Sequence, residues 1–382
     1  MDMDKRKNKG SSVLSVILWL LCGICLGLCI VFTVDLDKAL GESVGSFLVM
    51  YGLYMFLSVI AFIIQLIIHE TGHLIFGLLS GYGFSSFRIG SINFTKRDGK
   101  ITVWKKSVPG TAGQCLLSPP DYNGGDFPYI MYNLGGVFLN LIASFVFAFL
   151  FIAVKDVPVL NTVAAECAVI GFFYALFNGI PMQTKDIPND GYNALHTGDN
   201  TLSKRSFWTQ LKISELSYNG ARLKDMPDEL FFLPTQEENI NALIGSSAIF
   251  YENRLIDLER YDEANELCHL LLDGYTDMPG MYRNLLTIDR ISTDLILQNG
   301  KCTKEEIEEP KMADYLKKLA ASLEVHRNRY IVSLLLYNDE AEANKWLNEF
   351  EKVAKNYPNI GDIEMGRQLI RAAQEQKQLM AH

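Results

Sequence analysis

Long uncharged apolar runs dominate the first half of the chain and stop near residue 195. They cover residues 13–34, 44–79, 129–154 and about 157–182. Each run reaches the ~20 residues that a helix needs to cross a bilayer. Beyond them, charged helical stretches alternate with short breaks, as in a water-exposed helical protein. The pattern therefore predicts an α-helical polytopic membrane protein of about four transmembrane helices, followed by an all-α soluble domain.

The polar segment between the second and third apolar runs has the pattern of paired strands. Residues 92–95 and 101–104 are strand-like, and they flank a turn that contains Asp98 and Gly99. Asp-Gly between two such runs is a strong hairpin signal. We therefore expect a cytoplasmic β-hairpin at about 87–104. It is either a plain surface hairpin or a strand edge that holds an extended peptide by strand addition.

Three regions follow from this pattern. Residues 1–44 form a signal-anchor transmembrane helix with its outer loop, residues 45–195 form the membrane core, and residues 196–382 form the helical domain. Within the last region, residues 261–279 and 340–358 resemble each other, each with Pro 15 residues after the Ala of an Ala-Asn pair. The offset of 79 residues equals about two helical-hairpin repeats. The helical domain is therefore tetratricopeptide-like or a plain helical bundle.

Charge divides the chain in the same way. Residues 1–191 carry 13 basic and 13 acidic side chains, and the remainder carries 22 and 31, which gives the net charge of −9. An acidic soluble half argues against nucleic acid as a partner. Basic residues gather at the N-terminus and in the loop at 84–106, and such segments stay in the cytoplasm. We expect a multi-pass protein of a bacterial cell membrane with both termini in the cytoplasm.

The second apolar run contains the sequence His69-Glu70-Thr71-Gly72-His73. Histidines four residues apart share one helical face, so both imidazoles can bind one metal ion. Glu70 is turned away from the pair and can meet the attacking water, as in the H-E-x-x-H pattern of zinc proteases. The alternative is a pair of core histidines with a neutralised glutamate. Because ionisable groups are costly in lipid, a functional role is the better explanation.

The position of this motif along the helix sets its depth in the bilayer. Eight residues separate His73 from Gly81, where the helix is expected to end. At ~1.5 Å per residue this distance is about 12 Å. The motif should therefore lie inside the bilayer, nearer the cytoplasmic face.

A catalytic zinc ion needs a third protein ligand and one open position. Every other histidine of the chain lies beyond residue 195, outside the apolar runs, so a carboxylate is the expected third ligand. The last apolar helix ends near Pro181, and Pro188 follows shortly after. Irregular backbone between two prolines can line a cavity at membrane depth. Asp186 and Asp190 are both candidates for the third ligand.

These motifs together resemble the site-2 protease family of intramembrane zinc metalloproteases. The resemblance covers residues 45–191 and rests on the His-Glu-Thr-Gly-His run and on Asn178-x-x-Pro181 followed by Asp190-Gly191. A glycine and asparagine motif in the intervening helix ends at Asn140, and the hairpin matches a membrane-associated hairpin of some members. The gap from Pro181 to Asp190 is longer than the usual family spacing, which keeps Asp186 as a rival. No regulatory insertion is evident.

The resemblance implies specific roles for these residues. Glu70 is the expected catalytic base. The implied zinc ligands are His69, His73 and Asp190, and the implied substrate-binding residues are Asn140, Asn178 and Pro181. The alternative for Asn140 and Asn178 is that each only ties two membrane helices together.

The expected function is a zinc metalloendopeptidase that cleaves peptide bonds in or near transmembrane segments. Signal-peptide remnants, peptide-pheromone precursors and membrane-bound regulators are candidate substrates. The expected partners are the lipid bilayer, a membrane-embedded substrate and a protein bound to the helical domain. The alternative is a zinc-binding membrane protein without protease activity, such as a transport component or an inactive substrate-binding relative.

Overall fold

The structure of the protein is a computed structural model. It describes residues 2–33, 44–97, 99–105, 111–122, 125–184, 187–234, 242–275, 278, 280–318, 322–355, 357 and 359–381. The chain divides into two compact units, Met1–Asn93 with Ser107–Asn200 and Phe94–Lys106 with Thr201–His382.

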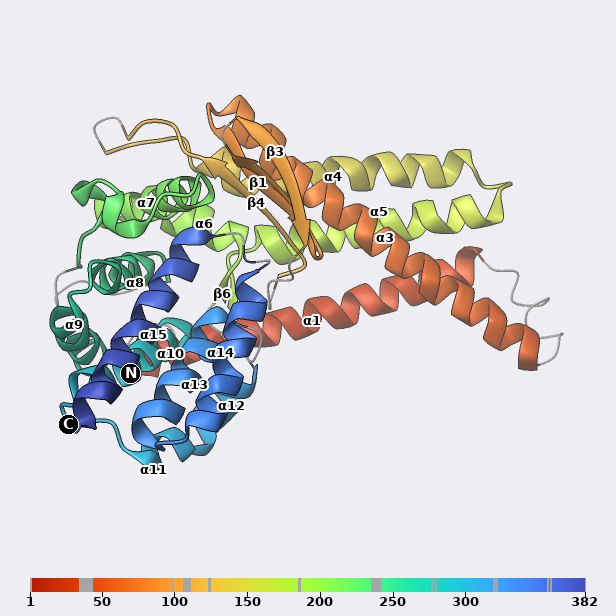
Figure 1. The fold of residues 1–382 in the computed structure, drawn as a ribbon. Coiled ribbons are helices and arrows are strands. Elements are labelled where there is room, and N and C mark those ends of the chain that lie inside the picture. Colours follow the sequence, from red (N-terminus) through yellow and green to blue (C-terminus); the bar gives the residue numbers. More distant parts are fainter. Residues whose placement is uncertain are drawn as a thin grey trace. The chain divides into compact units, whose positions relative to one another are not determined.

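The first unit is built on four long helices that coincide with the four apolar runs (Figure 1). All four are long and apolar enough to cross a membrane, which confirms this part of the prediction. Their outer faces expose large apolar side chains, and Phe145 and Phe149 are each 74% exposed. In a helix that crosses a membrane, lipid would cover such apolar side chains. The helices are α1 (Asp2–Thr33), α3 (Val44–Leu79), α4 (Ile130–Ala153) and α5 (Pro158–Gly179).

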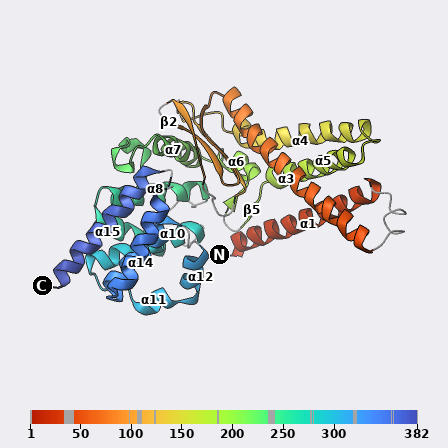
Figure 2. The ribbon, with the colours of Figure 1, turned by 45° about the vertical axis from the view of Figure 1, so that its right-hand side comes forward.

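Close backbone contacts hold these helices together. Figures 1 and 2 show α4 and α5 side by side, with α3 crossing them. At the crossing of α3 and α4, a Cβ on Gly72 would lie 2.3 Å from the Gly135 carbonyl oxygen. Small residues at such a crossing let two membrane helices approach closely. Helix α1 packs against α5 through a cluster that includes Leu18, Cys22 and Phe173.

The expected hairpin is part of a larger sheet. It forms β2 (Ile92–Arg97) and β3 (Lys100–Lys105) of a four-stranded sheet with the order β3-β2-β1-β4. Strands β1 (Gly83–Ile89) and β4 (Gly113–Ser118) pair antiparallel, with Gly83 opposite Ser118. These two strands were not predicted from the sequence. A register shift in β1 between Phe84 and Ser86 interrupts the alternation that marks a strand.

A short segment connects α5 to α6, the last helix of the first unit. It contains β5 (Gln183–Thr184) and β6 (Ile187–Pro188), which pair antiparallel, and leads into α6 (Asp190–His196). The stretch from Pro181 to Pro188, which was predicted to be irregular, therefore contains two short paired strands.

The second unit is helical apart from the hairpin strands that cluster with it. Helix α9 packs against α8 and α10, and α14 packs against α13, around one apolar core. The two similar sequence segments begin at the starts of α9 and α14. The described elements are α7 (Thr201–Tyr218), η1 (Leu223–Asp225), η2 (Asp228–Leu230), α8 (Ala242–Asp257), α9 (Tyr261–Gly274), α10 (Gly280–Leu297), α11 (Lys304–Glu308), α12 (Pro310–Lys318), α13 (Leu323–Ile331), the π-helix η3 (Val332–Leu336), α14 (Glu340–Ala354) and α15 (Ile360–Met380).

In this helical core, the charge of one buried arginine stabilises two buried carboxyl groups. Arg327 on α13 is buried and donates to Asp289 on α10, and Glu252 on α8 lies within the electrostatic reach of both. Burial raises the pKa of Glu252 and of Asp289, and the Arg327 guanidinium opposes both rises. Removing the cation would leave two uncompensated acids in an apolar environment.

We therefore expect Arg327→Met to destabilise the helical unit by ~3–5 kcal/mol, the range for breaking a buried ion pair. Hydrogen exchange of the α13 amides in detergent-purified protein measures this change as a lower opening free energy. Lys345→Met is the matched control, because Lys345 pairs with Glu342 at the exposed surface. Equal exchange in the Arg327 variant and wild type would contradict this account of the core.

Candidate metal centre

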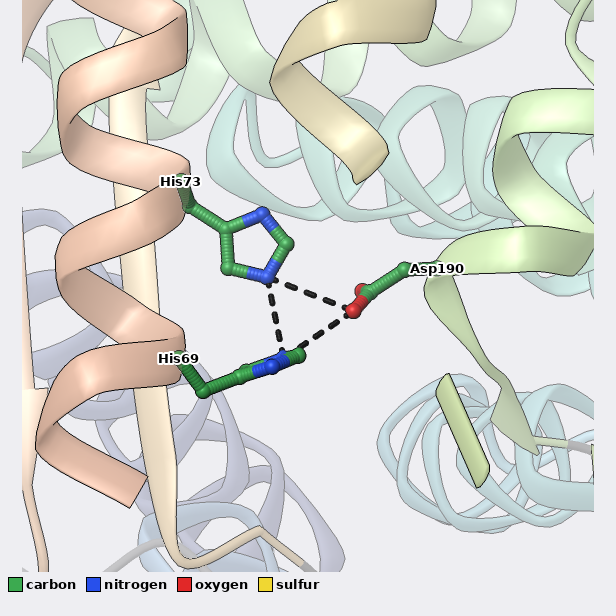
Figure 3. A group of neighbouring side chains, drawn as sticks. All are labelled: His69, His73 and Asp190. Carbon is green, nitrogen blue, oxygen red and sulfur yellow. Dashed lines mark hydrogen bonds and ion pairs between the residues drawn. The ribbon is translucent and has the colours of Figure 1, made fainter. Parts of the chain in front are cut away.

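Three side chains from distant parts of the first unit meet beside α3 (Figure 3). His69 and His73 project from successive turns of α3, and Asp190 is the first residue of α6. The Asp190 Oδ2 atom lies 3.0 Å from Nε2 of His69 and 3.3 Å from Nε2 of His73. The two Nε2 atoms are 3.1 Å apart. This arrangement could hold a metal ion.

The outer contacts of the two imidazoles decide which ring nitrogen faces the centre. Nδ1 of His69 lies 2.7 Å from Oδ1 of Asn140, and Nδ1 of His73 lies 2.8 Å from the carbonyl oxygen of Tyr132. Both of these oxygens accept hydrogen bonds, so in each ring they favour the tautomer that carries its hydrogen on Nδ1. Each Nε2 then presents a lone pair to Asp190. This orientation through an outer partner is typical of histidine ligands of metals.

The centre therefore brings three hydrogen-bond acceptors together without a donor among them. Asp190 Oδ2 is buried, and no hydrogen bond within the described chain satisfies it. Such an arrangement is unfavourable unless a cation lies between the acceptors. A proton added to one ring would bridge only one contact, whereas a metal ion would engage Asp190 and both imidazoles. Two imidazole nitrogens and one carboxylate oxygen fit the ligand set of a catalytic divalent metal.

Small residues make room for the imidazole and for the glutamate beside it. A Cβ on Gly136 of α4 would lie 2.5 Å from the His69 ring, so a larger residue would displace the ring. Glu70 is 6% exposed and lies against the first residue of β4, where a Cβ on Gly113 would lie 2.4 Å from Oε1 of Glu70. Glu70 on α3 thus lies against β4, and it is not one of the three residues that could hold the metal.

Asn189 fixes the position of Asp190. Its Oδ1 accepts hydrogen bonds from the backbone N–H groups of Met182 and Tyr192, at 3.0 and 2.9 Å. Its Nδ2 donates to two carbonyl groups at the end of α5, each at 2.6 Å. The side chain therefore caps α6 and ties its first turn to α5. Gly191 permits this closeness, because a Cβ there would lie 2.2 Å from the Gly179 carbonyl oxygen.

The structure brings the expected ligands together and gives the other expected residues different surroundings. Asn140 is fully buried against His69, and Asn178 donates to the Tyr174 carbonyl within its own helix. Pro181 is exposed just beyond the end of α5. The substrate-binding roles of these three residues stay predictions. Asp186 lies outside the described residues.

Three residues beside the centre were not predicted from the sequence. Tyr132 on α4 orients His73 through its backbone carbonyl, and Gln65 on α3 accepts from Asn140 on α4 at 2.8 Å. Both are contacts between helices, which no local pattern along the chain reveals. The role of Asn189 could have been predicted, because Asn directly before a helix is a favoured N-cap residue.

No family model, curated protein or solved structure matches this chain.

We expect Asp190→Asn to weaken metal binding by more than ~100-fold, beyond the 10–100-fold that is typical of changes to outer contacts. The measurement is metal content after dialysis of detergent-purified protein. Asp199→Asn is the matched control, because Asp199 is exposed just beyond the same short helix and bonds to His196, outside the centre. Asp186→Asn tests the rival ligand. Full metal content in the Asp190 variant would contradict the assignment.

Proposed function

We propose that this protein is an intramembrane zinc metalloprotease. The observation that carries the proposal is that His69, His73 and Asp190 meet in one place where they could hold a metal ion. His69, His73 and the neighbouring Glu70 belong to α3, a helix long and apolar enough to cross a membrane. The HExxH sequence adds the expected general base in the place where the family resemblance puts it. The resemblance to site-2 proteases supports the same activity.

Zinc is the metal that best suits these donors. Three protein ligands from imidazole and carboxylate groups leave one coordination position open, as catalytic zinc sites do. When bound, zinc would polarise the scissile carbonyl and lower the pKa of water to around 7. Asn140 and Tyr132 would keep both imidazoles in the orientation that the metal requires.

Glu70 would perform the proton transfers of the reaction. Its carboxylate takes a proton from the attacking water, whose oxygen forms a bond to the peptide carbonyl carbon. Glu70 then gives the proton to the leaving amine as the C–N bond breaks. The contact with Gly113 holds the carboxylate at one place for both transfers.

A membrane-embedded substrate must present an extended backbone to this site. A helix uses its carbonyl groups in internal hydrogen bonds, so a transmembrane segment has to unwind locally before hydrolysis. Strand β4 is at an edge of the described sheet, and its first residue touches Glu70. A substrate strand paired with β4 would therefore pass the catalytic base. The expected hairpin forms β2 and β3, which lie on the other side of β1 from β4, so β4 and not the hairpin is the edge strand beside Glu70.

The loop charges support a topology in which the N-terminus, the sheet and the helical unit face the cytoplasm. In that arrangement the helical unit would be a platform for a substrate or for a protein partner. A bacterial cell membrane is the proposed location.

We expect Glu70→Gln to abolish cleavage and to retain the metal, because Gln cannot accept the proton and Glu70 is not a ligand. Quantitative N-terminal proteomics on membranes from cells that make wild-type or variant protein measures this. New N-termini within or beside transmembrane segments should appear with wild type only. Glu166→Gln is the matched control, because Glu166 is also buried in a membrane-length helix but bonds to Ser58.

Identical N-termini with wild type and Glu70→Gln, together with normal metal content, would favour the alternative of a metal-binding membrane protein without protease activity.

A further inference from the structure

A continuous chain of buried amide groups connects His69 to the backbone of α5. Nδ1 of His69 meets Asn140 on α4, and Asn140 in turn meets Gln65, one turn before His69 on α3. Gln65 then reaches the carbonyl oxygen of Cys167 on α5. Gln65 and Asn140 are both completely buried, so water does not satisfy their amides.

The far end of this chain fixes the direction of every hydrogen bond in it. The Cys167 carbonyl can only accept, so Nε2 of Gln65 is the donor at 2.8 Å. Oε1 of Gln65 therefore faces Asn140 and accepts from its Nδ2 at 2.8 Å. The same Nδ2 also donates to the backbone carbonyl of Gln65 at 3.0 Å. Oδ1 of Asn140 is then the atom left for Nδ1 of His69.

We infer that Gln65 and Asn140 are positioning residues that set the tautomer of His69. They hold the ring hydrogen on Nδ1, so that the Nε2 lone pair points at the metal centre. This inference rests on the proposed zinc site and adds to it a determinant of metal affinity. Histidine ligands of metals commonly need such an outer partner.

The two imidazoles depend on different kinds of partner. His73 is oriented by the backbone carbonyl of Tyr132, which no side-chain substitution there removes. Among the described residues, the Nδ1 partner of His69 is the Asn140 side chain, so the orientation of His69 can be changed without altering a ligand. Glycine also gives this chain space, because a Cβ on Gly171 would lie 2.7 Å from Nε2 of Gln65. The asymmetry makes a selective test possible.

The first test reads the tautomers directly. Nitrogen-15 NMR of histidine-labelled, metal-free protein, at a pH where the rings are neutral, reports which nitrogen carries the hydrogen. We expect Nδ1 for both His69 and His73 in wild type. In Asn140→Leu, His69 should lose this preference and His73 should keep it. If His69 carries its hydrogen on Nε2 in the wild-type protein, this result alone would overturn the inference.

The second test measures zinc affinity by competition with a chelator in detergent. We expect Asn140→Leu to bind zinc 10–100-fold more weakly than wild type, as is typical when the outer partner of a ligand is lost. Gln65→Leu should have a smaller effect, because the Gln65 backbone carbonyl still accepts from Asn140. Wild-type affinity in both variants would overturn the inference.

Ser144→Ala is the matched control for a general loss of packing. Ser144 lies one turn beyond Asn140 on α4 and donates to a backbone carbonyl of α5, with no contact to the centre. It should bind zinc as wild type does, and a loss equal to that of Asn140→Leu would overturn the inference. Absence of zinc from wild type would instead refute the proposed function, and the NMR result would still decide the tautomer.

Discussion

The structure depends on one electrostatic constraint, which is that three buried hydrogen-bond acceptors face one another where lipid would exclude water. Such groups repel unless a cation lies between them. The acceptors stay in place because their outer atoms are fixed, at His69 by Asn140, at His73 by a backbone carbonyl and at Asp190 by the cap that Asn189 provides. The energetic cost of this arrangement without a metal is the strongest physical reason to assign a metal to it.

Helix packing makes that constraint possible. The crossing of α3 and α4 at Gly72 and Gly135 brings the two backbones into contact, and Gly136 leaves the space that the His69 ring fills. A larger residue at these places would separate the helices and move Asn140 away from the ring. The same closeness lets β4 lie against Glu70. The packing of these helices and the geometry of the site are therefore set by the same few glycines.

The sequence predicts the four long helices and the two histidine ligands because the signals for them are local. Apolar length defines α1, α3, α4 and α5, and the spacing of His69 and His73 defines a shared helical face. The sequence left the choice between Asp186 and Asp190 open, since that choice depends on how the chain turns after α5. The strands β1 and β4 and the role of Gln65 escaped prediction for a related reason. They depend on pairing and on interhelical hydrogen bonds, which have no repeating signature along the chain.

The most direct test of the account is X-ray absorption spectroscopy at the zinc edge on detergent-purified wild-type protein. The account predicts about one zinc per chain with four nitrogen or oxygen ligands at ~2.0 Å, of which two show the scattering pattern of imidazole. Sulfur ligands, six-fold coordination or the absence of zinc would contradict it.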